Sequence, residues 1–364
     1  MQLLIDGCVF ERSYQRGIQR YFRELFSRVP EDVGIDLYLN RRPVTKIPSA
    51  ARVTERTEEY LRNRGDLVGR ATSKLRRACF PTPYPKGDVF HSTYFTRSPD
   101  SAIPEVLTVH DMVAEVMPYY YDGDASSEIT IKRDCILGAE RIIAVSQATA
   151  DDLVAIYPEI AGRITVIYSG AEHLKKAQET EIASRIVPCC DYVVFVGDRR
   201  GYKNFATLLE AMKSAEWPEG MSLRVIGADF SEAERIAIRY RGLEKVVRVD
   251  VRPTDAAMRE VLVGSRGFVF PSLMEGFGFP LVEAQGLGVP VVASDTRVFR
   301  EIGGEGFVRV KPMDPDSIAR GVGKVVERSQ RERLIGLGLK NIERFSWNEC
   351  ARRTVGVWNQ VAGK

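Results

Sequence analysis

The chain has 364 residues, of which 44% are hydrophobic and 28% are charged. This length exceeds what one hydrophobic core normally serves and predicts two domains. The net charge of +3 argues against bulk nucleic-acid binding, and no apolar run is long enough to span a membrane.

The six cysteines are scattered without a CxxC pair, and the chain has only three histidines. This pattern argues against both a zinc site and a disulfide framework. The opening residues, MQLLIDG, lack the basic and apolar regions of a signal peptide. We therefore expect a cytoplasmic protein with reduced thiols.

Short β-branched runs alternate with helix-period segments along the whole chain. In the first half we expect strands at 2–6, 35–39, 89–92, 106–111, 141–146 and 164–169, and helices at 18–29 and 148–157. In the second half we expect strands at 191–198, 223–229, 246–251, 267–272 and 289–294, with a helix at 204–215. A βα alternation of this kind predicts an α/β protein whose open parallel sheets are covered by helices, formed twice.

A polar stretch, EHLKKAQETEIASRIVPCC, separates the two series of strands. We accordingly expect a first domain at 1–172, a linker at 173–190 and a second domain at 191–345. A last helix should occupy 346–364, because Ser346 and Glu349 have the spacing of a capping box, and we expect it to cross back to the first domain.

The segment 52–79 is basic and partly amphipathic. It fits either a solvated helix face or a contact with an anionic membrane surface, and the first reading is the simpler.

The stretch PSLMEGFGFPLVEAQG places two acids, Glu275 and Glu283, on either side of a glycine loop. The loop follows the buried strand GFVFPS, and a helix should begin near Pro280. Glycines before a helix N-terminus allow backbone N–H groups to face a phosphate or a sugar hydroxyl, and carboxylates accept hydrogen bonds from paired hydroxyls. Without the intervening glycines we would expect the two acids only to cap a helix.

A second strand-to-helix crossing carries cations. The strand VVFVG leads into DRRGYKNF, where Arg199 and Lys203 precede a helix that starts near Asn204. Two cations at such a crossing can neutralise a diphosphate, although they could also be ordinary surface charges. Crossings of this kind share one edge of an open sheet, so both loops can face one crevice.

The ordered fragments TVHDMVAEVMP, AVSQATADDL, ITVIYSGAE, FVGDRRGYKNF, PSLMEGFGFP, GVPVVASD and RFSWNECA resemble the retaining GT-B glycosyltransferases of the family-four type, also named glycosyl transferases group 1. The E-x7-E spacing of Glu275 and Glu283 is part of the resemblance, which covers nearly the whole chain. It implies a GT-B fold, in which two Rossmann-like domains face each other across a central cleft.

The resemblance also implies roles for residues. Glu283 would accept from the ribose hydroxyls, Glu275 would bind the hydroxyls of the donor sugar, and Arg199 and Lys203 would hold the diphosphate. His110 would lie near the donor sugar. The remaining donor-binding positions implied by the family are Gly276, Phe277, Gly278, Phe279 and Gly17. At Gly17 the chain departs from the many relatives that carry two adjacent glycines, because Arg16 precedes it.

The implied reaction is transfer of a hexose from a nucleotide-diphospho-sugar with retention of configuration, without a cofactor and without a metal ion. GDP-mannose is the first donor to consider, with UDP-sugars next. The acceptor would be a glycan or a lipid-linked glycan in polysaccharide biosynthesis, for example of lipopolysaccharide, at the inner face of the cell membrane. Acids such as Asp122 and Asp124 in YYYDGDASS are weaker candidates for a metal site.

Two other functions fit parts of the sequence. A catalytically silent GT-B protein that only binds nucleotides or acts as a scaffold would be expected to lack one of the four charged residues, and none is missing. A dehydrogenase would need G-x-G-x-x-G after the first strand, and LLIDGCVFE lacks it. His110 could be a satisfied strand-end histidine, and His91 fits a structural role as well as a place in the acceptor cleft.

Overall fold

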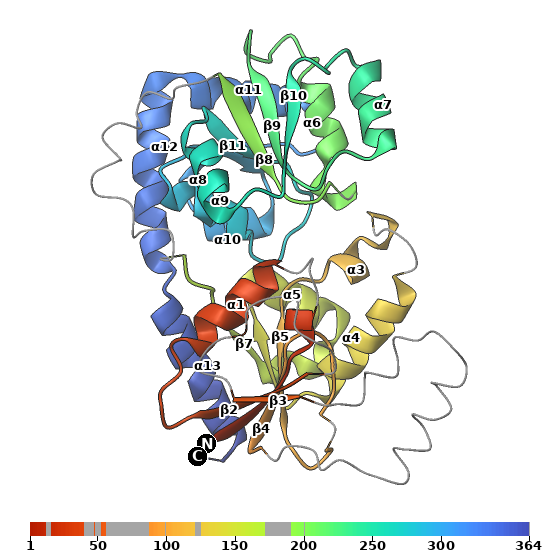
Figure 1. Ribbon diagram of the computed structural model, residues 1–364, viewed down its shortest axis with the longest axis vertical. Coiled ribbons are helices and arrows are strands. Elements are labelled where there is room, and N and C mark those ends of the chain that lie inside the picture. The colour runs from red at the N-terminus through yellow and green to blue at the C-terminus, as the bar shows by residue number, and fades with distance from the viewer. Residues whose placement is uncertain are drawn as a thin grey trace.

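The computed structural model describes residues 1–11, 16–39, 47, 52–55, 87–98, 100–120, 125–171, 191–199 and 201–363. Two parallel sheets form two lobes, stacked one above the other in Figure 1. The expected linker at 173–190, the acids Asp122 and Asp124, and all but the first four residues of the basic segment lie outside the described residues.

The N-terminal sheet has the strand order β3-β2-β1-β4-β5-β6-β7, and all its pairs are parallel. The strand order runs outward in both directions from the β1–β4 pair. Such a reversal opens a crevice at the carboxyl ends of the two central strands. The strands are β1 (Gln2–Asp6), β2 (Gly34–Leu39), β3 (Arg52–Glu55), β4 (Val89–Ser92), β5 (Glu105–Val109), β6 (Arg141–Ala144) and β7 (Ile164–Val166).

The C-terminal sheet has the order β10-β9-β8-β11-β12-β13 and is also wholly parallel. Its strand order reverses between β8 and β11, and the loops after these two strands carry the predicted cations and acids. The strands are β8 (Tyr192–Val196), β9 (Ser222–Gly227), β10 (Val247–Val251), β11 (Gly267–Phe270), β12 (Val291–Ser294) and β13 (Phe307–Val310). Each sheet therefore has the doubly wound order of a Rossmann-like fold, as the sequence predicted.

Helices follow most of the strands. They are α1 (Arg16–Phe26), α3 (Val113–Val116), α4 (Ser126–Gly138), α5 (Gln147–Ile156), α6 (Phe205–Ala211), α7 (Glu232–Tyr240), α8 (Asp255–Val263), α9 (Phe279–Gly286), α10 (Arg297–Gly303), α11 (Pro315–Val326), α12 (Arg328–Asn341) and α13 (Trp347–Val361). None of the described helices is long and apolar enough to cross a bilayer.

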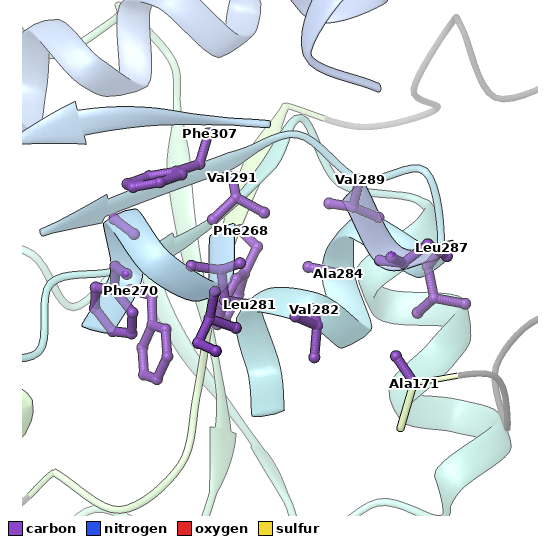
Figure 2. Close-up of a cluster of buried hydrophobic side chains, with 14 of the residues drawn as sticks. Ala171, Phe268, Phe270, Leu281, Val282, Ala284, Leu287, Val289, Val291 and Phe307 are labelled. Carbon is purple, nitrogen blue, oxygen red and sulfur yellow. The ribbon is translucent and has the colours of Figure 1, made fainter. Parts of the chain in front are cut away.

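The alternation of side chains along β11 explains why helices cover both faces of its sheet. Phe268 and Phe270 point to one face and pack with Leu281 of α9, as Figure 2 shows. Val269 points to the other face and packs with residues of α6 and α11. Both faces are buried, so polar groups can gather only at the strand ends.

The last helix, α13, packs on the N-terminal lobe, where it contacts α1, β5 and β6. It begins where the sequence predicts, because the Ser346 side chain accepts from the Glu349 backbone N–H. Trp347 and Trp358 are fully buried in the core that also holds β1 and α1. In Figure 1, α12 and α13 run down one side of both lobes.

His91, at the end of β4, is held in this core by two hydrogen bonds. Trp358 Nε1 lies 3.0 Å from His91 Nδ1, and His91 Nε2 lies 2.9 Å from Thr108 Oγ1. An indole can only donate, so Nδ1 accepts and Nε2 donates to Thr108. Of the two roles open for His91, the structure favours the structural one.

Burial gives the folded protein an acid sensitivity that can be measured. It lowers the pKa of His91 to about 3, with His110 adding to the effect, and lowers the pKa of His110 to about 4. The unfolded chain takes up these protons near pH 6.5, whereas the folded protein does not. The free energy of unfolding should therefore fall as the pH drops below about 6.5, by about 1.4 kcal/mol per pH unit for each histidine.

Denaturant unfolding between pH 7 and pH 5 checks this expectation. The variant His91→Gln keeps a hydrogen-bond acceptor for Trp358 but has no titrating group at this position. Its free energy of unfolding should therefore fall less steeply with pH, by about 1.4 kcal/mol per pH unit. Equal slopes for the variant and the wild type would contradict the assignment.

Candidate active site

Lys203 and Glu275 form an ion pair at the point where the C-terminal sheet reverses its strand order. The Lys203 Nζ donates to the Glu275 Oε1 at 2.6 Å, and each side chain is only 14% exposed. Lys203 ends the loop after β8, and Glu275 lies in the loop after β11. The sequence predicted that these two loops would share one crevice, and the ion pair brings them together.

Backbone and side-chain bonds fix the two loops to each other. The Leu273 N–H donates to the Tyr202 carbonyl at 2.8 Å, and the Asn204 Nδ2 donates to the Pro271 carbonyl at 3.1 Å. Asn204 has a left-handed φ of 59°, which asparagine tolerates better than most residues. These bonds therefore hold the two loops, and with them the Lys203–Glu275 pair, in place without a ligand.

The glycine loop ends in α9, whose N-cap is Gly278 with a φ of 89°. This positive φ explains the glycine, and Pro280 fits the first turn because its missing N–H would have no helical partner. The Phe277 side chain is buried, and its ring packs edge-on against Phe345 at 5.5 Å. The Phe279 ring stacks on Trp347 at 6.2 Å. These side chains anchor the loop. At Phe277 and Phe279, only the backbone amides therefore remain as candidate contacts to the sugar donor.

Gly276 lies against the carboxyl ends of β5 and β6 in the other lobe. Ser146 Oγ and Thr149 Oγ1 donate to the Gly276 carbonyl at 2.6 and 3.1 Å. A Cβ atom at Gly276 would overlap the carbonyl oxygen of His110 and lie 2.6 Å from its carbonyl carbon. The two lobes therefore approach so closely that only glycine fits.

Ser146 and Thr149 were missed as site residues by the sequence analysis, although both lie in the quoted fragment AVSQATADDL. Ser146 is also the N-cap of α5, where its side chain accepts from the Thr149 N–H. The capping pattern was the available signal, but it gave no hint that the same hydroxyl would donate across the lobes.

His110 follows β5 directly, opposite the glycine loop. Its Nε2 is buried and has no hydrogen-bond partner among the described residues. The ring packs edge-on against Tyr21 of α1 at 5.1 Å. Because burial keeps the imidazole neutral at physiological pH, one ring nitrogen can donate and the other can accept. His110 can therefore offer a ligand a hydrogen bond, but not a positive charge.

Glu283 lies in α9, and a cavity of about 370 Å³ opens beside it between α1, α8 and α9. Its carboxylate forms an ion pair with Arg20 of α1, and the cavity is lined by both residues. The two acids predicted from the glycine loop thus occupy different surroundings. Glu275 is paired within its own lobe, whereas Glu283 is paired across the lobes.

Arg199 contacts a different set of residues from Lys203. Its guanidinium forms a two-point ion pair with Glu234, donates to the Asp229 carbonyl at 2.9 Å, and lies 5.1 Å from the Phe230 ring centroid. The Arg199 Nη1 is buried and has no hydrogen-bond partner among the described residues, so the assignment of Arg199 to the diphosphate stays a prediction. The Glu234 carboxylate that Arg199 contacts belongs to the capping box that Ser231 and Glu234 form at the start of α7.

Gly17 lies in the first turn of α1, and a Cβ atom there would meet no atom of the described residues within 4 Å. The described part of the chain therefore shows no steric need for glycine at this position. Residues 12–15 of the preceding loop lie outside the described residues. In the part of the chain that is described, no group of three or more His, Cys, Asp or Glu side chains could hold a metal ion.

Two family models match the chain and between them span most of it. Residues 16–173 match the model described as Glycosyltransferase Family 4, and residues 184–337 match Glycosyl transferases group 1. The chain is a GT-B glycosyltransferase of the family-four type.

Among known relatives of this glycosyltransferase is O-antigen chain mannosyltransferase B of Escherichia coli, with 24% sequence identity. The alignment covers 94% of this chain and 95% of the relative. Sucrose-phosphate synthase from Thermosynechococcus elongatus has a similar fold, with a TM-score of 0.73 and 16% identity over 100% of this chain and 99% of the other. Anabaena HepE, solved in complex with UDP and glucose, has a TM-score of 0.72 and 16% identity over 98% of both chains. The two structural matches establish the GT-B fold alone.

Proposed function

We propose that this glycosyltransferase moves a hexose from a nucleotide-diphospho-sugar to a glycan or a lipid-linked glycan, with retention of configuration. The observation that carries the proposal is the pair Lys203–Glu275, which lies at a strand-order reversal beside a helix N-terminus. In such a site, the lysine can stabilise the negative charge of a departing diphosphate while the carboxylate binds the hydroxyls of a sugar.

Mannose is the sugar that we propose first, with GDP as the carrying nucleotide. The named function of the Escherichia coli relative, an O-antigen mannosyltransferase, supports mannose and a role in polysaccharide biosynthesis. The UDP in the HepE structure makes a UDP-sugar the second candidate. We place the reaction in the cytoplasm, with the acceptor presented at the inner face of the membrane.

In the proposed reaction, the bond between the anomeric carbon and the diphosphate oxygen breaks, and its electron pair stays with the diphosphate. The acceptor oxygen forms the new bond from the same face of the sugar, through an oxocarbenium-like state. The acceptor proton passes to the departing phosphate oxygen, so we assign no side chain as base. Lys203 and the N-terminus of α9 offset the growing negative charge.

The proposed substrate contacts follow from the site. Glu275 binds hydroxyls of the donor sugar, the neutral His110 offers another hydroxyl a hydrogen bond, and Glu283 accepts from the ribose beside its cavity. The backbone amides from Gly276 to Phe279 lie between the two acids. We assign no metal ion and no cofactor to the reaction.

Release of nucleoside diphosphate tests the proposal. The purified protein should release GDP from GDP-mannose in the presence of a mannose-containing acceptor glycan, and the product should retain the α-configuration by proton NMR. Release of UDP from UDP-glucose instead would keep the reaction class and change the donor. Tight nucleotide binding without turnover on any donor would favour the silent scaffold.

A further inference from the structure

Arg20 bridges the two lobes at the cavity beside Glu283. It lies in the second turn of α1, and its Nη1 donates to the Glu283 Oε1 of α9. Its Nη2 also lies 3.8 Å from the Asp255 Oδ2, at the start of α8. One guanidinium from the N-terminal lobe thus faces two carboxylates on two helices of the C-terminal lobe.

The two ion pairs differ in burial and therefore in how much they contribute to holding the lobes together. The side chains of Arg20 and Glu283 are 26% and 10% exposed, whereas that of Asp255 is 83% exposed. Exposed ion pairs contribute little because water and salt screen them, whereas breaking a buried pair leaves a charge poorly solvated. The contact that matters is the one between Arg20 and Glu283.

The core of the N-terminal lobe fixes the position of Arg20. Its neighbours on α1, Tyr21, Phe22 and Leu25, are fully buried in that core. The helix therefore cannot rotate to withdraw Arg20 without losing much of its apolar packing. The guanidinium is held toward the cleft before any ligand binds.

Two pairs of opposite charges lie at the cleft. Lys203 offsets Glu275 from within the same lobe, and Arg20 offsets Glu283 from the other lobe. A nucleotide-diphospho-sugar carries negative charge itself, so an acid without its cation would repel it. The other charged residues that line the cavity are Arg23, Glu24, Asp255 and Arg259.

We propose that Arg20 is a positioning residue of the donor site, which holds Glu283 for the ribose and ties the two lobes together at the cavity. This inference rests on the proposed role of Glu283. It gives a role in nucleotide binding to a residue of α1 in the N-terminal lobe, which lines the cavity together with α8 and α9. A carboxylate can accept several hydrogen bonds, so Glu283 can keep Arg20 and accept ribose hydroxyls together.

The test compares Arg20→Met, Arg20→Lys and a control, Arg352→Met, which removes a surface ion pair with Glu349 on α13. Titration calorimetry with GDP and with UDP should show roughly a tenfold or larger rise in Kd for Arg20→Met, because a buried charge loses its partner. Arg20→Lys should recover most of the affinity, and the control should match the wild type. With GDP-mannose, Arg20→Met should raise KM more than it lowers kcat.

Small-angle scattering of the same proteins without nucleotide separates this inference from the proposed function. Arg20→Met should have a larger radius of gyration than the wild type and the control. If the wild type binds neither nucleotide, the proposed function fails, and scattering still decides whether Arg20 ties the lobes. An unchanged or lower Kd for nucleotide in Arg20→Met would overturn the positioning role. A lower Kd would show that Arg20 obstructs the site. Unchanged scattering would overturn the role of Arg20 in tying the lobes together.

Discussion

Replacing Lys203 with methionine is expected to lower kcat by roughly a hundredfold or more, because it removes the cation that meets the charge of the leaving diphosphate. The Lys203 Nζ lies 2.6 Å from Glu275, in a loop fixed by the Leu273 and Asn204 hydrogen bonds. The measurement is steady-state release of nucleoside diphosphate at saturating donor. Lys340→Met, at an exposed position on α12, is the control and should leave the rate unchanged.

The loss of Lys203 also leaves the largely buried Glu275 without its partner, and this could lower activity through stability alone. The double variant Lys203→Met/Glu275→Gln separates the two effects. It removes the unpaired charge, so its thermal stability should recover relative to Lys203→Met. Its kcat should stay well below that of the single variant Glu275→Gln, which keeps Lys203. A kcat equal to that of Glu275→Gln, at recovered stability, would contradict a catalytic role for Lys203.

Replacing Gly276 with alanine is expected to lower kcat/KM by about a hundredfold while each lobe stays folded. The new methyl group would overlap the His110 carbonyl oxygen, and neither backbone can move without separating the lobes. A displacement of about an ångström between catalytic groups is enough for a loss of this size. The expected structural sign is a larger radius of gyration in small-angle scattering.

Gly356→Ala is the matched control for this substitution. Gly356 lies in α13 with nothing within 4 Å of a Cβ atom there, so alanine should be accepted and should slightly stabilise the helix. Far-UV circular dichroism should show normal secondary structure for both variants. If Gly276→Ala kept full activity and an unchanged radius of gyration, the close approach of the lobes would not be needed for function.

Much of the fold could be predicted from local patterns. The strand VVFVG and the strand GFVFPS are continuous apolar runs because both faces of the sheet are covered, and such runs are readable without tertiary information. Gly278 and Pro280 likewise mark the start of α9 through backbone conformation alone. The meeting of Lys203 with Glu275 followed from a general property of parallel sheets, that neighbouring strands deliver their loops to one edge.

The ion pair that Arg199 forms was not predicted from the sequence. Its sequence position, four residues before Lys203, suited a diphosphate site, yet its side chain is taken by Glu234 from the start of α7. Ser231 and Glu234 form a capping box in the structure, but a sequence does not say which loop a capping carboxylate will face. Arg20 was missed for the same reason, because on α1 it has the spacing of an ordinary solvent-facing charge.

The sequence by itself determined the two Rossmann-like sheets, the glycine loop before α9 and the family, because these depend on local backbone preference and on the order of motifs. Only the tertiary structure decided which charge pairs with which, that Arg20 reaches Glu283 and that Gly276 lies against His110. The last two contacts, Arg20 with Glu283 and Gly276 with His110, join residues more than a hundred positions apart. They depend on how two lobes close over each other, and no local pattern of residues encodes that geometry.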